Sequence, residues 1–470
     1  MRIAWFSPLP PLRSGIATYS ADLLAVLDRE HEIDRFVDGL GRTPPGARTF
    51  DAHDFVWKHR RNPYDLITYQ LGNAPWHDFM WAYLARYPGL VVLHDPRLHH
   101  ARARDLLSRQ RADDYRREFW YDHPDARPDF VEYAVEGLGG PIYYAWPMQR
   151  VVMETARLVA VHNPWVAADL RDEYPGARVE AIHLGHPASG APDPAARERV
   201  RAALGVPATS VLFGAFGKIT GEKRIGPILR AFAAIVREQA DVHLVLAGDA
   251  SDYPALAEEV ASPAVARRVH VMGYLPDEAV GDCLAATDAC LCLRWPTALE
   301  TSASWLHCLA ASRPTVISDL AHLVDIPTVD PREWRRSPAP GIRPVAIAID
   351  LLDEDESLRL AMRRLATDAT LRDRLARAGH AYWAANHTLD VMAGDYRRLL
   401  ALAAERPAPA PPNLPAHFTE DHSSLARAIA REFGLELDIL GADSVGDGLQ
   451  AVPRGPISTP TRRPRWGPRV

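Results

Sequence analysis

A glycine-rich stretch with two lysines, GAFGKITGEKR (214–224), contains the first residues of this sequence whose types and spacing could do chemistry. Gly217 follows an apolar run and lets a ligand approach the backbone closely, and Lys218 and Lys223 add two positive charges before an expected helix. Free N–H groups and the dipole at a helix start favour an anion. The stretch indicates a phosphate or diphosphate site, although a glycine turn with two solvated lysines explains it equally well.

The spacing in this stretch excludes two common nucleotide-binding classes. It matches neither the GxxxxGK[ST] loop of an ATPase nor the GxGxxG fingerprint of a dinucleotide-binding domain. The two lysines are also unusual in this chain, because only three of its 54 basic residues are lysine, the third being Lys58. A phosphorylated ligand of another kind is therefore the better hypothesis.

A second segment, RWPTALETSASWLHC (294–308), places Glu300, Thr301 and Ser302 at the start of a helix expected over 300–311. Hydroxyl and N–H groups at that position could bind a diphosphate, while the Glu300 carboxylate could accept from sugar hydroxyls. Ordinary helix capping, with a glutamate at the positive end of the helix dipole, is the alternative.

The first half of the chain offers two further candidates. Ser14 and Gly15 open an expected helix after a proline-rich loop, and His94 and Asp95 end the apolar run LVVLHD. Ligands of parallel sheets bind beyond the carboxyl ends of the strands, where both pairs would lie. A tight turn and a structural histidine are the alternatives. The basic residues that follow, 97–104, indicate a solvated helix face or a contact with an acidic acceptor or a membrane surface.

No metal site is expected. The cysteines lie in apolar segments without paired CxxC spacing or matching histidines, which favours buried reduced thiols over zinc: Cys283, Cys290, Cys292 and Cys308. The acidic pair Asp353 and Asp355 begins an expected helix, where carboxylates favour the positive end of the dipole.

Composition narrows the class of protein. The chain has 470 residues, 47% of them apolar and 24% charged, which is typical of a globular protein of several domains. Its net charge of −6 argues against general nucleic-acid binding. No apolar run reaches the ~20 residues of a membrane span, and the N-terminus lacks the features of a secretory signal. A cytoplasmic protein is expected, with peripheral contact at the inner membrane face through the Arg-rich region or the tail left open.

Strand and helix patterns alternate twice along the chain, which predicts the α/β class with two Rossmann-like doubly wound domains facing across a cleft, plus a Pro-rich tail. The expected parts are a first domain, a linker, a second domain, a helix returning to the first domain and a largely disordered tail: 1–187, 188–208, 209–385, 386–404 and 405–470.

Together these segments resemble glycosyltransferase family 4, retaining enzymes of the GT-B fold, over residues 1–404. FGKITGEKR (216–224) resembles the family's FGR-x-x-x-x-K phosphate loop, with Lys218 where arginine usually stands. The segment 293–319 resembles the strand, loop and helix of its Glu-x(7)-Glu motif, with a GETS-type loop as in one branch of the family. The segment 243–249 resembles the strand ending at the family's glycine, and 269–280 the part that contacts the nucleotide base.

The resemblance implies a hexose transfer from a nucleotide-diphosphate sugar to a saccharide, lipid-linked or small-molecule acceptor, with retention and without metal or other cofactor. It implies four catalytic residues: His94 against the transferred sugar, Lys218 and Lys223 on the leaving diphosphate, and Glu300. The implied donor-binding residues include three of these and eight more: Gly15, Gly217, Lys218, Lys223, Gly248, Gly273, Tyr274, Glu300, Thr301, Ser302 and His307.

One position departs from the family pattern. The second glutamate of the motif, which holds the ribose, falls at His307 or Cys308, depending on the alignment, and neither is a carboxylate. A non-catalytic sugar-nucleotide-binding protein and a GT-B nucleotide-sugar epimerase therefore remain as alternatives.

Overall fold

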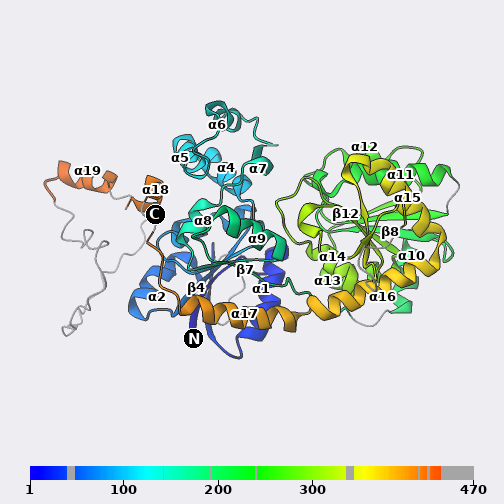
Figure 1. Ribbon diagram of the computed structural model, residues 1–470, viewed down its shortest axis with the longest axis horizontal. Helices are drawn as coiled ribbons and strands as arrows, with labels where there is room; N and C mark the ends of the chain where they lie inside the picture. Colours follow the sequence, from blue (N-terminus) through cyan, green and yellow to red (C-terminus); the bar gives the residue numbers. More distant parts are fainter. Residues whose placement is uncertain are drawn as a thin grey trace, which may run out of the picture. The chain divides into compact units, whose positions relative to one another are not determined.

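The computed structural model describes residues 1–39, 48–140, 142–189, 193–238, 241–334, 343–410, 413–420 and 424–435. The strands within them assemble into two seven-stranded sheets (Figure 1). Residues 1–418 form one compact unit that contains both sheets, and the chain from Thr419 onward forms a second unit. The expected α/β class with two Rossmann-like domains is confirmed.

The first sheet has the strand order β3-β2-β1-β4-β5-β6-β7, with parallel pairing throughout. Its strands are β1 (Arg2–Phe6), β2 (Glu32–Val37), β3 (Thr49–Asp51), β4 (Leu66–Leu71), β5 (Leu90–Leu93), β6 (Leu158–Val161) and β7 (Val179–Ala181). Strands β4, β5 and β6 are buried along their whole length, as expected of apolar strands covered on both faces. The order reverses between β1 and β4, so a ligand crevice is expected at their carboxyl ends.

Helices surround this sheet and fill the long connection between β5 and β6. Those that follow the other strands are α1 (Gly15–Leu27), α2 (Phe55–Arg61), α3 (Met80–Leu84) and α9 (Pro164–Glu173). The connection contains α4 (His99–Ser108), α5 (Ala112–Asp122), α6 (Pro128–Val135), α7 (Ile142–Ala145) and α8 (Arg150–Thr155). The connection thus contains several short helices and not one long one, because prolines and glycines such as Pro128, Gly139 and Pro147 interrupt it.

The second sheet has the order β10-β9-β8-β11-β12-β14-β13, again with parallel pairing. Its strands are β8 (Val211–Phe216), β9 (Val242–Ala247), β10 (Val269–Gly273), β11 (Ala289–Cys292), β12 (Thr315–Ser318), β13 (Thr328–Val329) and β14 (Ala346–Ile349). The strand order reverses between β8 and β11. The loop after β8 contains Lys218 and Lys223, and the loop after β11 contains Glu300.

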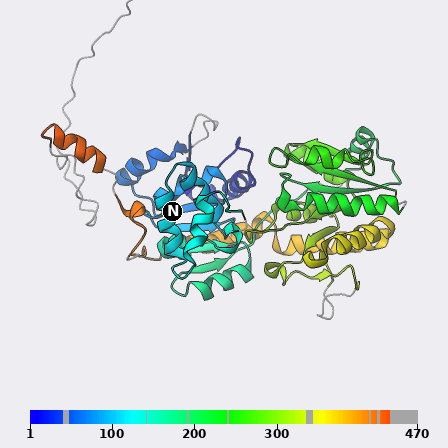
Figure 2. The ribbon, with the colours of Figure 1, turned by 90° about the horizontal axis from the view of Figure 1, so that it is seen from above.

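Both faces of the second sheet are covered by helices (Figure 2). The helices are α10 (Pro194–Leu204), α11 (Ile225–Arg237), α12 (Leu256–Val260), α13 (Asp277–Ala286), α14 (Ala303–Ala310), α15 (Glu354–Thr367) and α16 (Ala369–Asn386). Alternate residues of β8 belong to different cores: Phe213 packs in the cluster with α11 and α15, and Leu212 in the cluster with α13. This alternation explains why the strand is apolar at every position.

Helix α17 (Leu389–Ala404) continues from α16 and packs against the first domain. Its Tyr396 is fully buried, with its ring centroid 5.7 Å from that of Trp5 in β1. The hydroxyl of Tyr396 lies 2.7 Å from that of Tyr19 in α1. The chain thus crosses from one domain to the other through two consecutive helices.

The last described residues divide between the two units. In the first, Phe418 of α18 (Ala416–Thr419) belongs to the core of the first domain and is 6% exposed. The tail expected to be largely disordered over 405–470 is therefore ordered and buried at this segment. The second unit contains α19 (Ser424–Glu432), and residues 436–470, expected to be disordered, lie outside the described residues.

Candidate functional site

The turn after β8 encloses a lysine side chain. Gly217 has φ +89°, and a Cβ atom there would lie 2.6 Å from Lys223 Nζ and 2.9 Å from Ser304 Oγ. A Cβ on Gly248, at the end of β9, would lie 2.0 Å from the Gly217 carbonyl oxygen. Both glycines are therefore needed for β8 and β9 to end in contact around the lysine.

Lys223, at the end of the short helix η4 (Gly221–Lys223), is a partly buried cation of this site. Its ammonium group donates to the Phe216 carbonyl oxygen and lies 3.5 Å from the Ser304 hydroxyl of α14. Burial lowers the pKa of Lys223 to about 8, and the positive charge of Arg294 acts in the same direction. An anion placed between Lys223 and the N-terminus of α14 would relieve this cost.

Lys218 lies apart from this arrangement. Its side chain is 51% exposed and forms an ion pair with Asp252. The sequence made the two lysines equivalent, but their environments differ, because Lys218 precedes the buried Ile219 and lies on the exposed side of the turn.

Residues of the first domain contact the second near the end of β10. Gly273 has φ +67°, and Tyr274 after it is 47% exposed. The guanidinium of Arg13, in the loop between β1 and α1, lies 4.2 Å from the centre of the Tyr274 ring. Beside Gly15 the space is open, so backbone is accessible there. Arg13 was not identified in the sequence, where nothing signals a partner 261 positions away.

Glu300 holds the loop after β11 in shape. One carboxylate oxygen accepts from Arg294 Nε at 2.8 Å, and the other accepts from the Thr297 hydroxyl at 2.8 Å and the Ala298 N–H at 2.9 Å. Arg294 was missed in the sequence, although its place just beyond a parallel strand is a signal that could have identified it. The pair faces the two cavities described below.

The helix expected over 300–311 begins at Ala303. Ser302 is its N-cap and accepts from the Trp305 N–H at 3.3 Å. Thr301, still in the loop, donates from its hydroxyl to the His162 carbonyl oxygen at 2.9 Å. The expected start of the helix is wrong by three residues. Glu300 accepts hydrogen bonds within the loop and Thr301 donates one to the first domain, so neither residue extends the helix.

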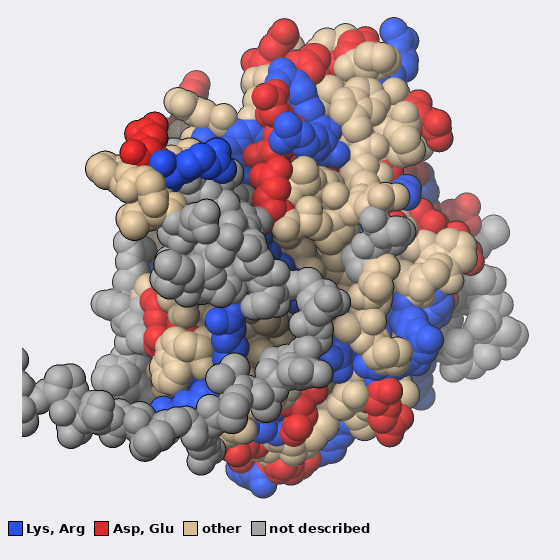
Figure 3. Space-filling view, turned by 90° about the vertical axis from the view of Figure 1, so that its left-hand side faces the viewer, with Lys and Arg blue, Asp and Glu red and all other residues tan. Residues whose placement is uncertain are grey.

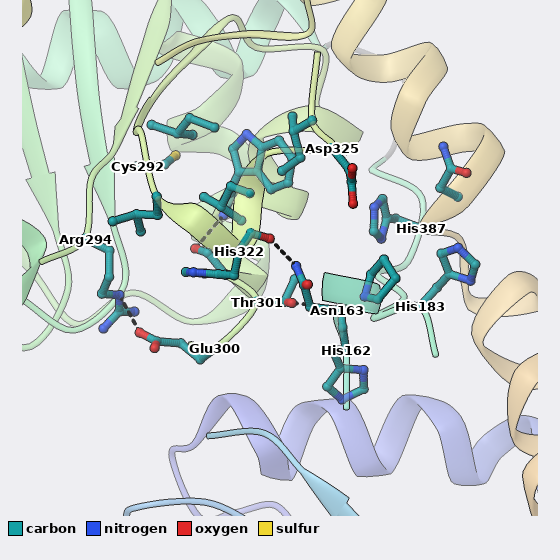
Figure 4. A pocket seen from close by; sticks show the side chains of 18 of the residues that line it. His162, Asn163, His183, Cys292, Arg294, Glu300, Thr301, His322, Asp325 and His387 are labelled. Carbon is teal, nitrogen blue, oxygen red and sulfur yellow. Dashed lines mark hydrogen bonds and ion pairs between the residues drawn. The ribbon is translucent and has the colours of Figure 1, made fainter. Parts of the chain in front are cut away.

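A cavity of about 220 Å³ lies between the ends of β6 and β7 and the loops after β11 and β12 (Figure 4). Arg294, Glu300 and Thr301 line one side, and His162 and Asn163 line the other. The Asn163 amide donates to the carbonyl oxygen of His322, which follows β12, at 2.6 Å. Together with the Thr301 bond, this contact joins the two domains across the cavity.

A second cavity, of about 610 Å³, lies on the other side of Arg294 and Glu300, which line both. The first domain contributes Asn73, Asp95, His100, Arg104, Tyr143 and Tyr144, and the second contributes Thr220, Glu222, Pro296 and Ala298. The Arg97 N–H donates to the Ala298 carbonyl oxygen at 3.2 Å, and the Tyr144 hydroxyl donates to Glu222 at 3.3 Å. Helices α4 and α7 thus complete a space that opens at the ends of β5, β8 and β11.

His94 is not among the residues that line either cavity. It is buried, and its Nε2 lies 2.8 Å from the side-chain oxygen of Gln70, whose amide bonds the Tyr396 hydroxyl at 3.2 Å. Burial holds the pKa of His94 well below its ordinary value, so the ring is neutral. The neighbouring Asp95 is the member of this pair that lines the larger cavity.

His307 also lies away from the cavities. Its ring stacks on that of His186, with centroids 4.3 Å apart, and burial lowers its pKa to about 3. Cys308, the other position at which the second glutamate could fall, is fully buried. Of the expected residues, the structure gathers Gly217, Lys223, Gly248, Glu300, Thr301 and Ser302 around the ends of β8 and β11, and Lys218, Gly273 and Tyr274 at their periphery.

Solved structures share this architecture. The chain resembles Alr3699/HepE from Anabaena in complex with UDP and glucose, with a TM-score of 0.58 and 15% identity over 85% of this chain and 99% of that one. It resembles sucrose-phosphate synthase from Thermosynechococcus elongatus, with a TM-score of 0.57 and 16% identity over 85% and 99%. It also resembles WaaG, a glycosyltransferase involved in lipopolysaccharide biosynthesis, with a TM-score of 0.57 and 15% identity over 84% of this chain and 99% of that one. The fold is that of the GT-B glycosyltransferases.

The sequence comparison is more specific within the second domain. Residues 210–331, which contain the Lys223 turn and the Glu300 loop, match the family described as glycosyl transferases group 1. The chain is also 28% identical over 207 residues to alpha-maltose-1-phosphate synthase of Mycolicibacterium smegmatis (strain ATCC 700084 / mc(2)155), a match over 41% of this chain. It spans about half the length of that curated relative.

Proposed function

We propose that this protein is a retaining glycosyltransferase of family 4 that moves a hexose from a nucleotide-diphosphate sugar to an acceptor. The observation that carries the proposal is the partly buried Lys223 ammonium, which lies 3.5 Å from the Ser304 hydroxyl at the start of α14, within the region that matches the group 1 family. Two structures of one relative support a nucleotide-sugar donor: Alr3699/HepE is described in complex with UDP and glucose and in complex with UDP-glucose.

In the proposed reaction, the bond from the anomeric carbon to the diphosphate breaks and the acceptor oxygen forms its bond on the same face of the sugar. Lys223 and the N–H groups at the start of α14 stabilise the charge that develops on the departing diphosphate. A donor phosphate oxygen takes the acceptor proton, so no protein base is needed. Glu300 and Arg294 shape the loop beside the transferred sugar, and Lys218 is retained as a secondary contact with the donor. His94, which lines neither cavity, is assigned no contact with the sugar.

A second candidate is a non-catalytic sugar-nucleotide-binding protein. It is favoured by the lack of a carboxylate at His307 and Cys308, where the family holds the donor ribose. A panel of UDP-glucose, GDP-mannose and ADP-glucose distinguishes the two functions. The binding protein would shift its melting temperature with a donor but release no nucleotide, whereas the enzyme would release nucleotide faster when sugars are added.

Turnover in this panel is expected to survive saturating EDTA. Lys223 and the α14 N-terminus provide the positive potential that a divalent metal supplies at carboxylate-lined sites. Asp355, at the start of α15, forms an exposed ion pair with Arg230 of α11 at 2.8 Å instead of facing the donor site. The D353A/D355A variant should also stay active. Loss of nucleotide release in EDTA, restored by Mn²⁺, would contradict the metal-free mechanism.

Donor affinity is expected to fall as the pH rises above 8. The pKa of Lys223 is depressed to about 8, so its positive charge is present below that pH and is lost above it, about tenfold per pH unit. The donor KM measured from pH 6.5 to 9.5 should rise accordingly. Lys223→Arg, which stays charged throughout, serves as the control and should flatten the rise; an equal rise in both proteins would refute the assignment.

We further propose a cytoplasmic enzyme, with any contact to the inner membrane face made by the tail. No described helix is long and apolar enough to cross a bilayer. The arginines of α4 and α5 are largely paired with acids, for example Arg116 with Glu132 at 2.7 Å and Arg117 with Asp114 at 2.7 Å. Basic and acidic side chains are likewise interspersed on the face seen in Figure 3. A basic lipid-binding surface is therefore not expected on these helices.

A further inference from the structure

The charges around the larger cavity bear on which acceptors it can hold. This cavity joins the first-domain residues at the ends of β4 and β5 to the Arg294–Glu300 pair, so in the proposed function it receives the acceptor. The inference below rests on that function. Its lining residues all lie within the described part of the chain, and besides His100 only two of them, Arg104 and Arg294, are basic.

Both arginines already have acidic partners. Arg104 pairs with Asp78 at 2.5 Å and also donates to the Asn73 carbonyl oxygen. Arg294 pairs with Glu300 at 2.8 Å. An incoming phosphate group would have to share one of these arginines with its carboxylate, which already neutralises the positive charge and would repel the phosphate.

The carboxylates of the lining oppose a further anion. Asp95 accepts from the Asn73 N–H at 2.7 Å, and burial raises its pKa to about 6, with the negative charge of Glu300 acting in the same direction. Glu222 accepts from the Tyr144 hydroxyl on the opposite wall. Three carboxylates, Asp95, Glu222 and Glu300, thus face a space that contains no unpaired arginine. A doubly charged phosphate monoester would be repelled there.

The same lining suits hydroxyl groups. Carboxylates are strong acceptors for O–H donors, and three of them at separate positions can fix the orientation of a polyol. Aromatic rings of α4 and α7 add apolar surface: His100 packs edge-on against Tyr143 and Tyr144, with centroids 4.8 and 4.6 Å away. Rings beside hydrogen-bonding groups are expected where a ligand has both C–H faces and hydroxyls.

We propose that the acceptor bound in this cavity is a neutral saccharide and that Asp95 and Glu222 exclude sugar phosphates. The curated relative is named for a sugar phosphate product, and one structural relative is a sucrose-phosphate synthase. The inference therefore predicts that this chain takes an acceptor without a phosphate group, unlike the sugar phosphates in those two names.

The test compares matched acceptor pairs with whichever of UDP-glucose, GDP-mannose and ADP-glucose releases nucleotide fastest. Glucose with glucose 6-phosphate, and maltose with maltose 1-phosphate, are offered at equal concentrations. We expect kcat/KM to be at least thirtyfold higher for the neutral member of a pair. Equal or faster transfer to the phosphorylated member would overturn the inference, as would a failure of every neutral sugar to accept hexose.

Variants locate the selectivity. Asp95→Asn and Glu222→Gln should each narrow the neutral-to-phosphorylated ratio by about tenfold, whereas the control Asp355→Asn, on the exposed side of α15, should leave it unchanged. An unchanged ratio in both cavity variants would overturn the assignment to Asp95 and Glu222. Donor binding, followed separately by the melting-temperature shift with each nucleotide sugar, distinguishes the outcomes: no shift means that the proposed function fails, while a shift with a reversed ratio means that only the acceptor inference fails.

Discussion

Replacing Lys223 with alanine is expected to lower kcat/KM for the sugar nucleotide by two to three orders of magnitude, or ~3–4 kcal/mol of transition-state stabilisation. Lys223 is the partly buried cation in the turn after β8, and its ammonium group lies between the Phe216 carbonyl oxygen and Ser304. Positive charge held in such a position needs no reorganisation when the diphosphate departs. The loss should appear in kcat as well as in KM, because the charge of the leaving group grows in the transition state.

Lys218→Ala is the matched control for this prediction. The side chain is half exposed and paired with Asp252, so its charge is screened by water and its loss should change kcat/KM by less than tenfold. Steady-state kinetics on both variants, with circular dichroism to establish that each is folded, provide the comparison. Equal losses in the two variants would contradict the distinction that the structure makes between the lysines.

Much of the fold could be predicted from the sequence, because buried parallel strands leave continuous apolar runs. The runs at 66–71, 90–93, 211–216 and 242–247 all form strands. Strand β2, with the sequence EIDRFV, went unrecognised because its charged residues interrupt the apolar pattern. Asp34 is nevertheless buried, since Arg48 and the Tyr64 hydroxyl satisfy its carboxylate. Those partners come from later parts of the chain, and a local pattern does not contain them.

The candidate site was predictable in position more than in detail. The rule that ligands bind beyond parallel strands points to the turns after β8 and β11, where Lys223 and Glu300 lie. It does not separate Lys223 from Lys218, because burial depends on how the turn packs on α14. Nor does it indicate that Glu300 pairs with Arg294 or that Thr301 bonds the first domain. Each of these contacts depends on tertiary packing.

The tail shows that a local sequence pattern can also fail to predict burial. The Pro-rich composition after Glu405 predicts a segment without a core of its own, and taken alone that interpretation is reasonable. Phe418, however, packs into a core that belongs to the first domain, with its ring centroid 6.4 Å from that of Trp81. A short segment can be buried without forming a core if the rest of the chain supplies one.

This packing includes a buried ionic network. Arg102 donates to both oxygens of Glu118, through Nε at 2.7 Å, and its guanidinium lies 4.3 Å from the centre of the Trp81 ring. His417 lies 2.8 Å from the same carboxylate. Burial alone would raise the pKa of Glu118, but Arg102 and His417 hold it below its ordinary value. Residues 417 and 418 thus cover an ion pair that is 2–3% exposed.

Truncation after Glu405 should therefore lower the free energy of unfolding of the first domain by about 3.5–6 kcal/mol, whereas truncation after Glu420 should leave it nearly unchanged. Losing Phe418 removes roughly 2–3 kcal/mol of apolar burial, and losing the His417 contact to a charged group removes about 1.5–3 kcal/mol more. Thermal unfolding of the two truncated proteins, with Phe418→Ala and His417→Ala in the full chain, would measure these contributions. Equal melting temperatures for the two truncations would contradict the prediction. Because α4 carries Arg102 of this ion pair and also lines the proposed acceptor cavity, we expect the shorter protein to lose acceptor turnover before it loses donor binding.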